Sequence, residues 1–159
     1  MGLIAFFKDA GERLFGKSVN AAAADPAQKA AADREAATAI ENHLARFGFE
    51  VTALTVTFDT KTATAKVFGV AKDQETKEKV ILAAGNVEGV AAVDDRMTVD
   101  RSTPPAQYYT VVKGDTLSKI AKHFYGNANE YMRIFEANKP MLQHPDRIYP
   151  GQNLRIPPK

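Results

Sequence analysis

The side chains that most often carry out catalysis are scarce in this sequence and lie far apart. There is no cysteine, so thiolate nucleophiles, disulfides and cysteine-based zinc sites are excluded. The three histidines, His43, His123 and His144, lack the spacing of metal ligands. Asp94 and Asp95 are adjacent, so in a strand their carboxylates face opposite ways and do not form an acid–base pair. No Ser/His/Asp set or phosphate-binding loop is present, and we expect a protein that is not an enzyme.

The composition is that of an ordinary soluble globular protein and argues against two classes of partner. Of the 159 residues, 45% are hydrophobic and 25% are charged, and the net charge is only +2. Because the basic residues are scattered among acidic ones, we expect no nucleic-acid partner. No stretch approaches the roughly 20 apolar residues of a membrane span. The first apolar residues lack a preceding basic region and a cleavage site, so we expect no secretion signal and a cytoplasmic location.

Residues 3–15 carry an amphipathic pattern that predicts a short N-terminal helix. Its apolar residues recur at helical spacing, namely Leu3, Phe6, Phe7, Ala10, Leu14 and Phe15. We expect this helix to dock on the neighbouring domain, with Gly11 as a break or C-cap. A membrane-surface helix is the alternative, although its polar face lacks a basic excess. A linker is expected over residues 17–24, so that helix and linker together occupy 1–24.

Residues 25–100 predict an α+β domain in the order helix, strand, strand, helix, strand. Asp25 and Pro26 suit the start of the first helix, and Gly48 suits its end. The expected elements are a helix over 26–47, strands over 54–58 and 63–67, a helix over 73–84 and a strand over 90–99. This order predicts that both helices cover one face of a small sheet.

Two prolines stiffen residues 101–107, which we expect to link this domain to a C-terminal domain over 108–157. Turn residues and helical spacing predict a strand–helix–helix–strand order in the second domain. Its first segment, 108–121 (YYTVVKGDTLSKIA), and its last, 148–157 (IYPGQNLRIP), together resemble the LysM family from end to end.

LysM modules usually bind glycans that contain N-acetylglucosamine, such as peptidoglycan. The resemblance implies a glycan groove between two turns, formed by Gly114, Asp115, Thr116 and Leu117 and by Ile148, Tyr149, Pro150 and Gly151. The alternative is that the same residues are simply the turns and helix caps of the module.

Residues 26–100 are similar to a BON domain, through Phe68-Gly69 at a strand end and the segments 85–90 (GNVEGV) and 93–95 (VDD). A BON domain followed by a LysM domain resembles the small bacterial potassium-binding proteins of BON–LysM architecture, and the match covers nearly the whole chain. The matching segments include 8–12 (KDAGE), 125–129 (YGNAN) and 135–142 (FEANKPML). Members of that family bind potassium in the cytoplasm and change conformation when they do so.

Potassium is large and weakly charged, and it prefers several neutral carbonyl oxygens to a dense carboxylate cluster. No calcium-loop spacing is present. Free carbonyls occur at helix C-termini, where the helix dipole ends negative. The resemblance points to two such segments, which offer the carbonyls of Phe7, Ala10, Gly85, Val87 and Val90. The alternative is that both are C-caps solvated by water, and if Gly11 does not break the helix, the Ala10 carbonyl is used within it.

We therefore expect a monomeric cytoplasmic protein that senses or buffers potassium. The bound ion is expected to draw the N-terminal helix, the BON domain and the LysM domain into a compact form. A peptidoglycan-binding adaptor of the cell envelope, acting through the LysM domain, is the alternative function.

Overall fold

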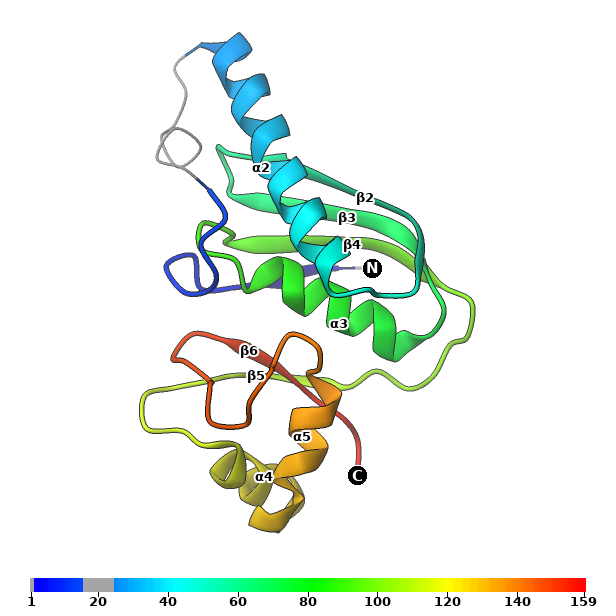
Figure 1. The fold of residues 1–159 in the computed structure, drawn as a ribbon, viewed down its shortest axis with the longest axis vertical. Coiled ribbons are helices and arrows are strands. Elements are labelled where there is room, and N and C mark those ends of the chain that lie inside the picture. The colour runs from blue at the N-terminus through cyan, green and yellow to red at the C-terminus, as the bar shows by residue number, and fades with distance from the viewer. Residues whose placement is uncertain (1, 16–24) are drawn as a thin grey trace.

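The computed structural model describes residues 2–15 and 25–159 and contains a four-stranded sheet and a two-stranded sheet (Figure 1). The linker expected over 17–24 lies outside the described residues. The elements are β1 (Leu3–Ala5), α2 (Pro26–Arg46), β2 (Val51–Asp59), β3 (Thr64–Ala71), α3 (Gln74–Gly85), β4 (Ala92–Val99), β5 (Gln107–Thr110), α4 (Leu117–Tyr125), the 3-10 turn η1 (Ala128–Glu130), α5 (Tyr131–Ala137) and β6 (Asn153–Ile156). The α+β class is confirmed. Among the described residues, no helix has the length and apolar character needed to span a bilayer.

The larger sheet has the strand order β1-β4-β3-β2, and α2 and α3 both cover one of its faces (Figure 1). β2 pairs with β3 antiparallel, whereas β4 returns parallel to β3 after the crossover through α3. Alternate residues such as Val67, Val93 and Met97 are buried against the helices. The predicted helix–strand–strand–helix–strand order is therefore confirmed.

The two helices begin and end as their sequences predict. The Asp25 side chain accepts a hydrogen bond from the Ala27 amide at the start of α2, and Pro26 occupies the first turn. α3 begins in the same way at Asp73 and ends at Asn86. The C-terminus of α3 therefore faces the second domain, where Asn86 hydrogen-bonds to Asn153.

The predicted N-terminal helix is wrong, because residues 3–5 form the edge strand β1. Leu3–Ala5 pairs antiparallel with Ala92–Asp94 of β4 and so covers an otherwise open sheet edge. Leu3 and Phe7, which the helical pattern placed on the buried face, are 69% and 60% exposed. Gly11 has φ +119°, a value that no α-helix contains.

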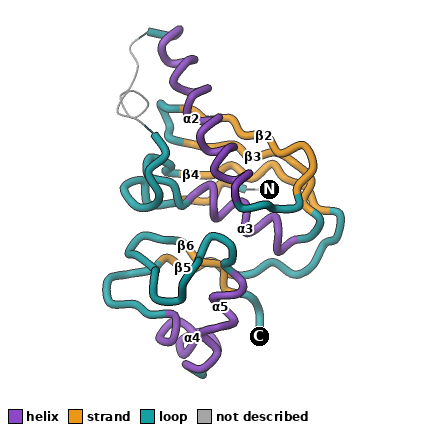
Figure 2. Tube along the Cα trace, viewed as in Figure 1, coloured by secondary structure: helices purple, strands orange, loops and turns teal. Residues whose placement is uncertain are grey.

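The C-terminal domain has the predicted strand–helix–helix–strand order. β5 and β6 pair antiparallel, and α4 and α5 pack against them around a core that includes Ile120, Ile134 and Leu154. Thr116 is the N-cap of α4 and accepts a hydrogen bond from the Lys119 amide. Figure 2 shows the long loop that leads from α5 to β6 lying near α3 and the N-terminal loop.

Candidate functional site at the domain junction

The loop of residues 6–12 lies directly on the turn of residues 86–91 that follows α3. Four backbone hydrogen bonds join the two segments: Phe6 N–H to Ala91 O at 2.8 Å, Gly89 N–H to Lys8 O at 2.7 Å, Glu12 N–H to Asn86 O at 3.0 Å, and Glu88 N–H to Glu12 O at 2.9 Å. The sequence predicted that an N-terminal helix docks on the neighbouring domain. An extended strand and loop make that contact instead.

Two glycines make this close approach possible. A Cβ atom on Gly11 would lie 2.4 Å from the Asn86 carbonyl oxygen, and its φ of +119° is one that side-chain-bearing residues rarely adopt. A Cβ atom on Gly85 would lie 2.0 Å from Cζ of the buried Phe6 ring. Loop and turn therefore fit each other only because both positions lack a side chain.

The five carbonyl groups expected to bind a cation lie on these two contacting segments. Phe7 O accepts a hydrogen bond from the Ala10 amide, and Val87 O accepts one from the Val90 amide, both at 3.1 Å. Within residues 2–15 and 25–159, no hydrogen bond reaches the carbonyl oxygens of Ala10, Gly85 or Val90. Because residues 7–11 are not helical, the Ala10 carbonyl is not used inside a helix.

The C-terminus of α3 carries a partial negative charge that no basic side chain of its own offsets. The last turns of α2 and α4 contain basic residues, whereas the last turn of α3 contains none. Cations are stabilised at such an end by about 0.3–1 kcal/mol when the site is exposed to solvent. In the described part of the chain, no group of three or more His, Asp or Glu side chains is placed to hold a metal ion. A cation here would therefore depend on backbone oxygens.

The first of the two turns expected to hold a glycan, residues 114–117, is held by local hydrogen bonds. Asp115 accepts hydrogen bonds from the Tyr109 hydroxyl at 2.7 Å and from the Val112 amide at 2.9 Å. Thr116 caps α4, and Leu117 is buried in the domain core. Gly114 has φ +89° and is exposed to solvent.

The second turn, Ile148, Tyr149, Pro150 and Gly151, touches the N-terminal loop. The Gly151 amide donates to Val111 O at 2.8 Å, which ties this turn to the end of β5. A Cβ atom on Gly151 would lie 2.7 Å from Cβ of Ala10 and 3.3 Å from Cβ of Phe7. The loop of residues 6–12 is therefore packed between the turn after α3 and this turn of the C-terminal domain.

Two asparagines that sequence analysis did not assign to a site join the domains. The Asn86 side chain donates to Asn153 O at 2.8 Å and accepts from the Asn153 amide at 2.9 Å, and it also contacts Met141 Sδ at 3.3 Å. The Asn153 side chain in turn donates to Ala5 O at 3.2 Å. The sequence did not indicate this contact of Asn86, because its partner lies 67 residues away.

A buried ion pair between Glu78 of α3 and Arg155 of β6 forms a second link between the domains, with Nε and Oε2 2.5 Å apart. Glu78 also accepts a hydrogen bond from the Ala106 amide in the linker at 3.0 Å. Burial, reinforced by the nearby Glu78 and Asp95 carboxylates, raises the pKa of Tyr108. The C-terminal domain is thus held against α3 by charged and polar contacts that are largely removed from water.

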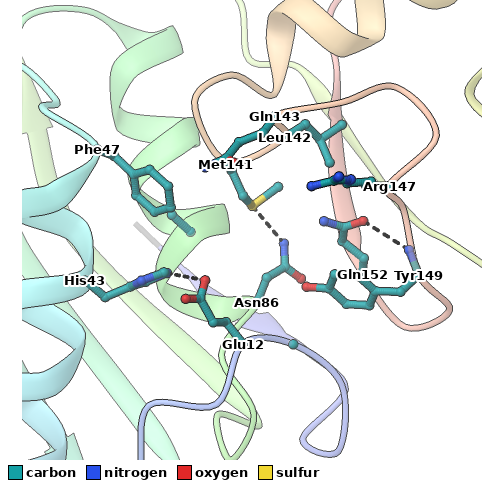
Figure 3. Close-up of a pocket in the computed structure, with 12 residues that line it drawn as sticks. Glu12, His43, Phe47, Asn86, Met141, Leu142, Gln143, Arg147, Tyr149 and Gln152 are labelled. Atoms are coloured by element: carbon teal, nitrogen blue, oxygen red, sulfur yellow. Dashed lines mark hydrogen bonds and ion pairs between the residues drawn. The ribbon is translucent and has the colours of Figure 1, made fainter.

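A cavity of about 380 Å³ adjoins the junction (Figure 3). It is lined by residues from the N-terminal loop, from α2 and from the loop between α5 and β6. Glu12 Oε2 lies 3.7 Å from Nε2 of the buried His43. Burial lowers the pKa of His43, and the Glu12 carboxylate partly opposes that change. Burial also raises the pKa of Tyr149 to about 12.

The C-terminal domain matches a known protein family. Residues 109–157 match the LysM domain, which confirms that prediction. Shorter matches cover an uncharacterized protein of Deinococcus radiodurans, 39% identical over 55% of this chain and 38% of that protein, and the uncharacterized protein YqbP of Bacillus subtilis, 41% identical over 31% of this chain and 26% of that protein.

The potassium binding protein Kbp of Escherichia coli O6:H1 is 45% identical over 157 residues, which are 99% of each chain. The chain belongs to the family of this protein.

Proposed function

We propose that this protein binds a potassium ion through backbone carbonyl oxygens where the loop of residues 6–12 meets the turn after α3. The ligands proposed are the carbonyls of Phe7, Ala10, Gly85, Val87 and Val90. The observation that carries the proposal is the hydrogen-bonded contact between these two segments, in which three of the five carbonyls accept no hydrogen bond from the described residues. The name of the 45% identical relative supports the choice of ion.

The chemistry of the two segments favours a large monovalent cation. Neutral carbonyl oxygens replace the hydration shell of potassium at low electrostatic cost, whereas divalent ions are usually bound with carboxylate ligands. The uncompensated C-terminus of α3 adds negative potential without adding a full charge. Both features favour potassium over calcium or magnesium.

We also propose that potassium binding makes the protein more compact. The loop of residues 6–12 contacts both the turn after α3 and Gly151 of the LysM domain. An ion that fixes this loop would therefore stabilise both contacts together, and the domains would separate more readily without it. A cytoplasmic location and a role in sensing or buffering potassium belong to this proposal, as does the assignment of residues 25–100 to the BON family, which the observed element order fits.

The experiment that tests the proposal is calorimetric titration of the full chain with potassium chloride in potassium-free buffer, with sodium chloride as the matched control. We expect saturable heat with potassium and little with sodium, together with a smaller radius of gyration by small-angle scattering when potassium is added. An absence of binding heat would refute the proposed ion, and an unchanged radius would refute the compaction.

Glycan binding through the LysM domain is the second candidate function, and the domain match favours it. In this structure, however, Ala10 and Phe7 cover one side of Gly151. Sedimentation with purified peptidoglycan tests this function. Strong retention that is unaffected by potassium would favour the envelope adaptor, whereas no retention would leave the turns with a structural role.

A further inference from the structure

The cavity at the domain junction has walls from four separate parts of the chain, one of which is the end of α3 with Ala83 and Asn86. The N-terminal loop contributes Gly11 and Glu12, and α2 contributes His43. The loop between α5 and β6 contributes Arg147 and Tyr149. Its volume of about 380 Å³ falls within the range of small-molecule binding sites, which is about 300–1,000 Å³. The cavity therefore has room for a small ligand that would touch both domains.

Two opposite charges face this cavity without neutralising each other. Glu12 and Arg147 both line it, and their charged atoms lie more than an ion-pair distance apart. Within the part of the chain that the structure describes, Arg147 forms no ion pair, and the only basic group paired with Glu12 is His43. Burial lowers the pKa of His43 and so disfavours the charged form of its imidazole. The wall thus presents one negative and one positive charge, with no net charge.

Unused hydrogen-bonding groups also line this cavity. The Gln152 side-chain oxygen accepts a long hydrogen bond, 3.4 Å, from the Tyr149 amide. Among the described residues, the Gln152 side chain and Tyr149 are joined only through Gln152 Oε1 and the Tyr149 backbone amide, so the Gln152 amide nitrogen and the Tyr149 hydroxyl form no hydrogen bond. The Asn86 amide, in contrast, is fully engaged with Asn153 and Met141. Figure 3 shows the Glu12 carboxylate beside His43 on one side of the cavity and the Arg147 guanidinium beside Gln152 on the other.

We propose that the cavity binds a small zwitterion of the size of an amino acid or a dipeptide. The ammonium group of the ligand pairs with the Glu12 carboxylate, and its carboxylate pairs with the Arg147 guanidinium, whose planar donors suit a carboxylate. Tyr149 and Gln152 donate to polar atoms between the two ends. A simple cation or anion would leave one wall charge unmatched, whereas a zwitterion matches both. This cavity is distinct from the five carbonyls proposed to bind potassium, although the loop of residues 6–12 borders both sites.

The test uses the full chain and three related dipeptides. Alanyl-alanine carries both end charges, N-acetyl-alanyl-alanine lacks the ammonium group, and alanyl-alanine amide lacks the carboxylate. We expect calorimetric binding of alanyl-alanine, with at least tenfold weaker binding when either end is capped. Glu12→Gln and Arg147→Gln should each weaken alanyl-alanine binding at least tenfold. The exposed Glu35→Gln and Arg101→Gln, which remove the same charges away from the cavity, should have no effect.

Equal binding of the capped and uncapped dipeptides, or no binding of any of them, would overturn the proposal. The amide chemical shifts of Gly11 and Gln152 in the wild-type chain provide an independent measurement. A ligand in the cavity should change both of these shifts. Shifts confined to other parts of the chain would also overturn it. The same samples are titrated with potassium, so that failure of the zwitterion site is distinguished from failure of the potassium site.

Discussion

Replacing Gly11 with alanine adds one carbon atom at the contact on which the proposed potassium site depends. The new Cβ would lie 2.4 Å from the Asn86 carbonyl oxygen, which belongs to backbone that cannot turn aside as a side chain can. The φ of +119° adds strain of about 1–3 kcal/mol for a residue with a side chain. The loop must therefore move away from the turn, which weakens the hydrogen bonds of Glu12, Glu88 and Gly89, each contributing about 0.5–1.5 kcal/mol.

We expect Gly11→Ala to weaken potassium binding by about 3 kcal/mol, which corresponds to roughly a hundredfold increase in Kd. The matched control is Gly48→Ala, because Gly48 also has a positive φ, +69°, but a Cβ there meets nothing within 4 Å. That control should cost about 1–2 kcal/mol of stability and leave potassium affinity unchanged. Calorimetry measures both variants in potassium-free buffer. A folded Gly11→Ala protein with wild-type affinity would refute the link between this contact and potassium.

Three further predictions concern stability. Gly85→Ala places a Cβ 2.0 Å from the Phe6 ring and should displace it, which costs about 1.5–3 kcal/mol in urea unfolding; unchanged stability would contradict the packing described. Arg155→Met leaves the Glu78 carboxylate buried without its partner and should lower the free energy of unfolding by about 3–5 kcal/mol. Adding Glu78→Gln to the same chain should restore much of that stability. A loss of less than about 1 kcal/mol in Arg155→Met would contradict this prediction. Because burial lowers the pKa of His43 below 6.5, the unfolded chain takes up that proton first, so stability should decline as the pH falls below 6.5. His43→Gln should remove that part of the pH dependence in unfolding curves, and an identical pH profile would show that His43 does not contribute.

Most of the fold could be predicted from local sequence signals. The caps Asp25 and Asp73 and the alternating strands indicated the first domain. The match between the two ends of the LysM sequence indicated the second. The cap and strand signals succeed because each lies within a few residues and reflects the hydrogen bonds of one element.

The N-terminal strand could not be predicted in the same way. Residues 3–7 are all apolar, so the alternation of β1, with Ile4 and Phe6 turned inward and Leu3 and Ala5 outward, does not show in the sequence. Helical spacing fitted the same residues equally well. The choice is made by the open edge of β4, which lies some 90 residues away along the chain and offers its backbone groups for pairing.

The candidate site was predicted in part. The two contacting segments were identified through their family resemblance, and Gly11 was predicted to be a break or C-cap of a helix. Asn86, Asn153 and the Glu78–Arg155 pair were not recognised, because each depends on a partner in the other domain. No local pattern reports a contact of that kind.

Carbonyl ¹³C chemical shifts report directly on whether the five proposed carbonyl groups bind potassium. The full chain, labelled with ¹³C and ¹⁵N, is titrated with potassium chloride and, as the control, with sodium chloride. We predict that the largest carbonyl shifts with potassium occur at Phe7, Ala10, Gly85, Val87 and Val90, and that sodium produces much smaller ones. Potassium-dependent shifts that omit these five carbonyls would show that they do not bind the ion. Equal responses to both ions would show that the site does not select potassium.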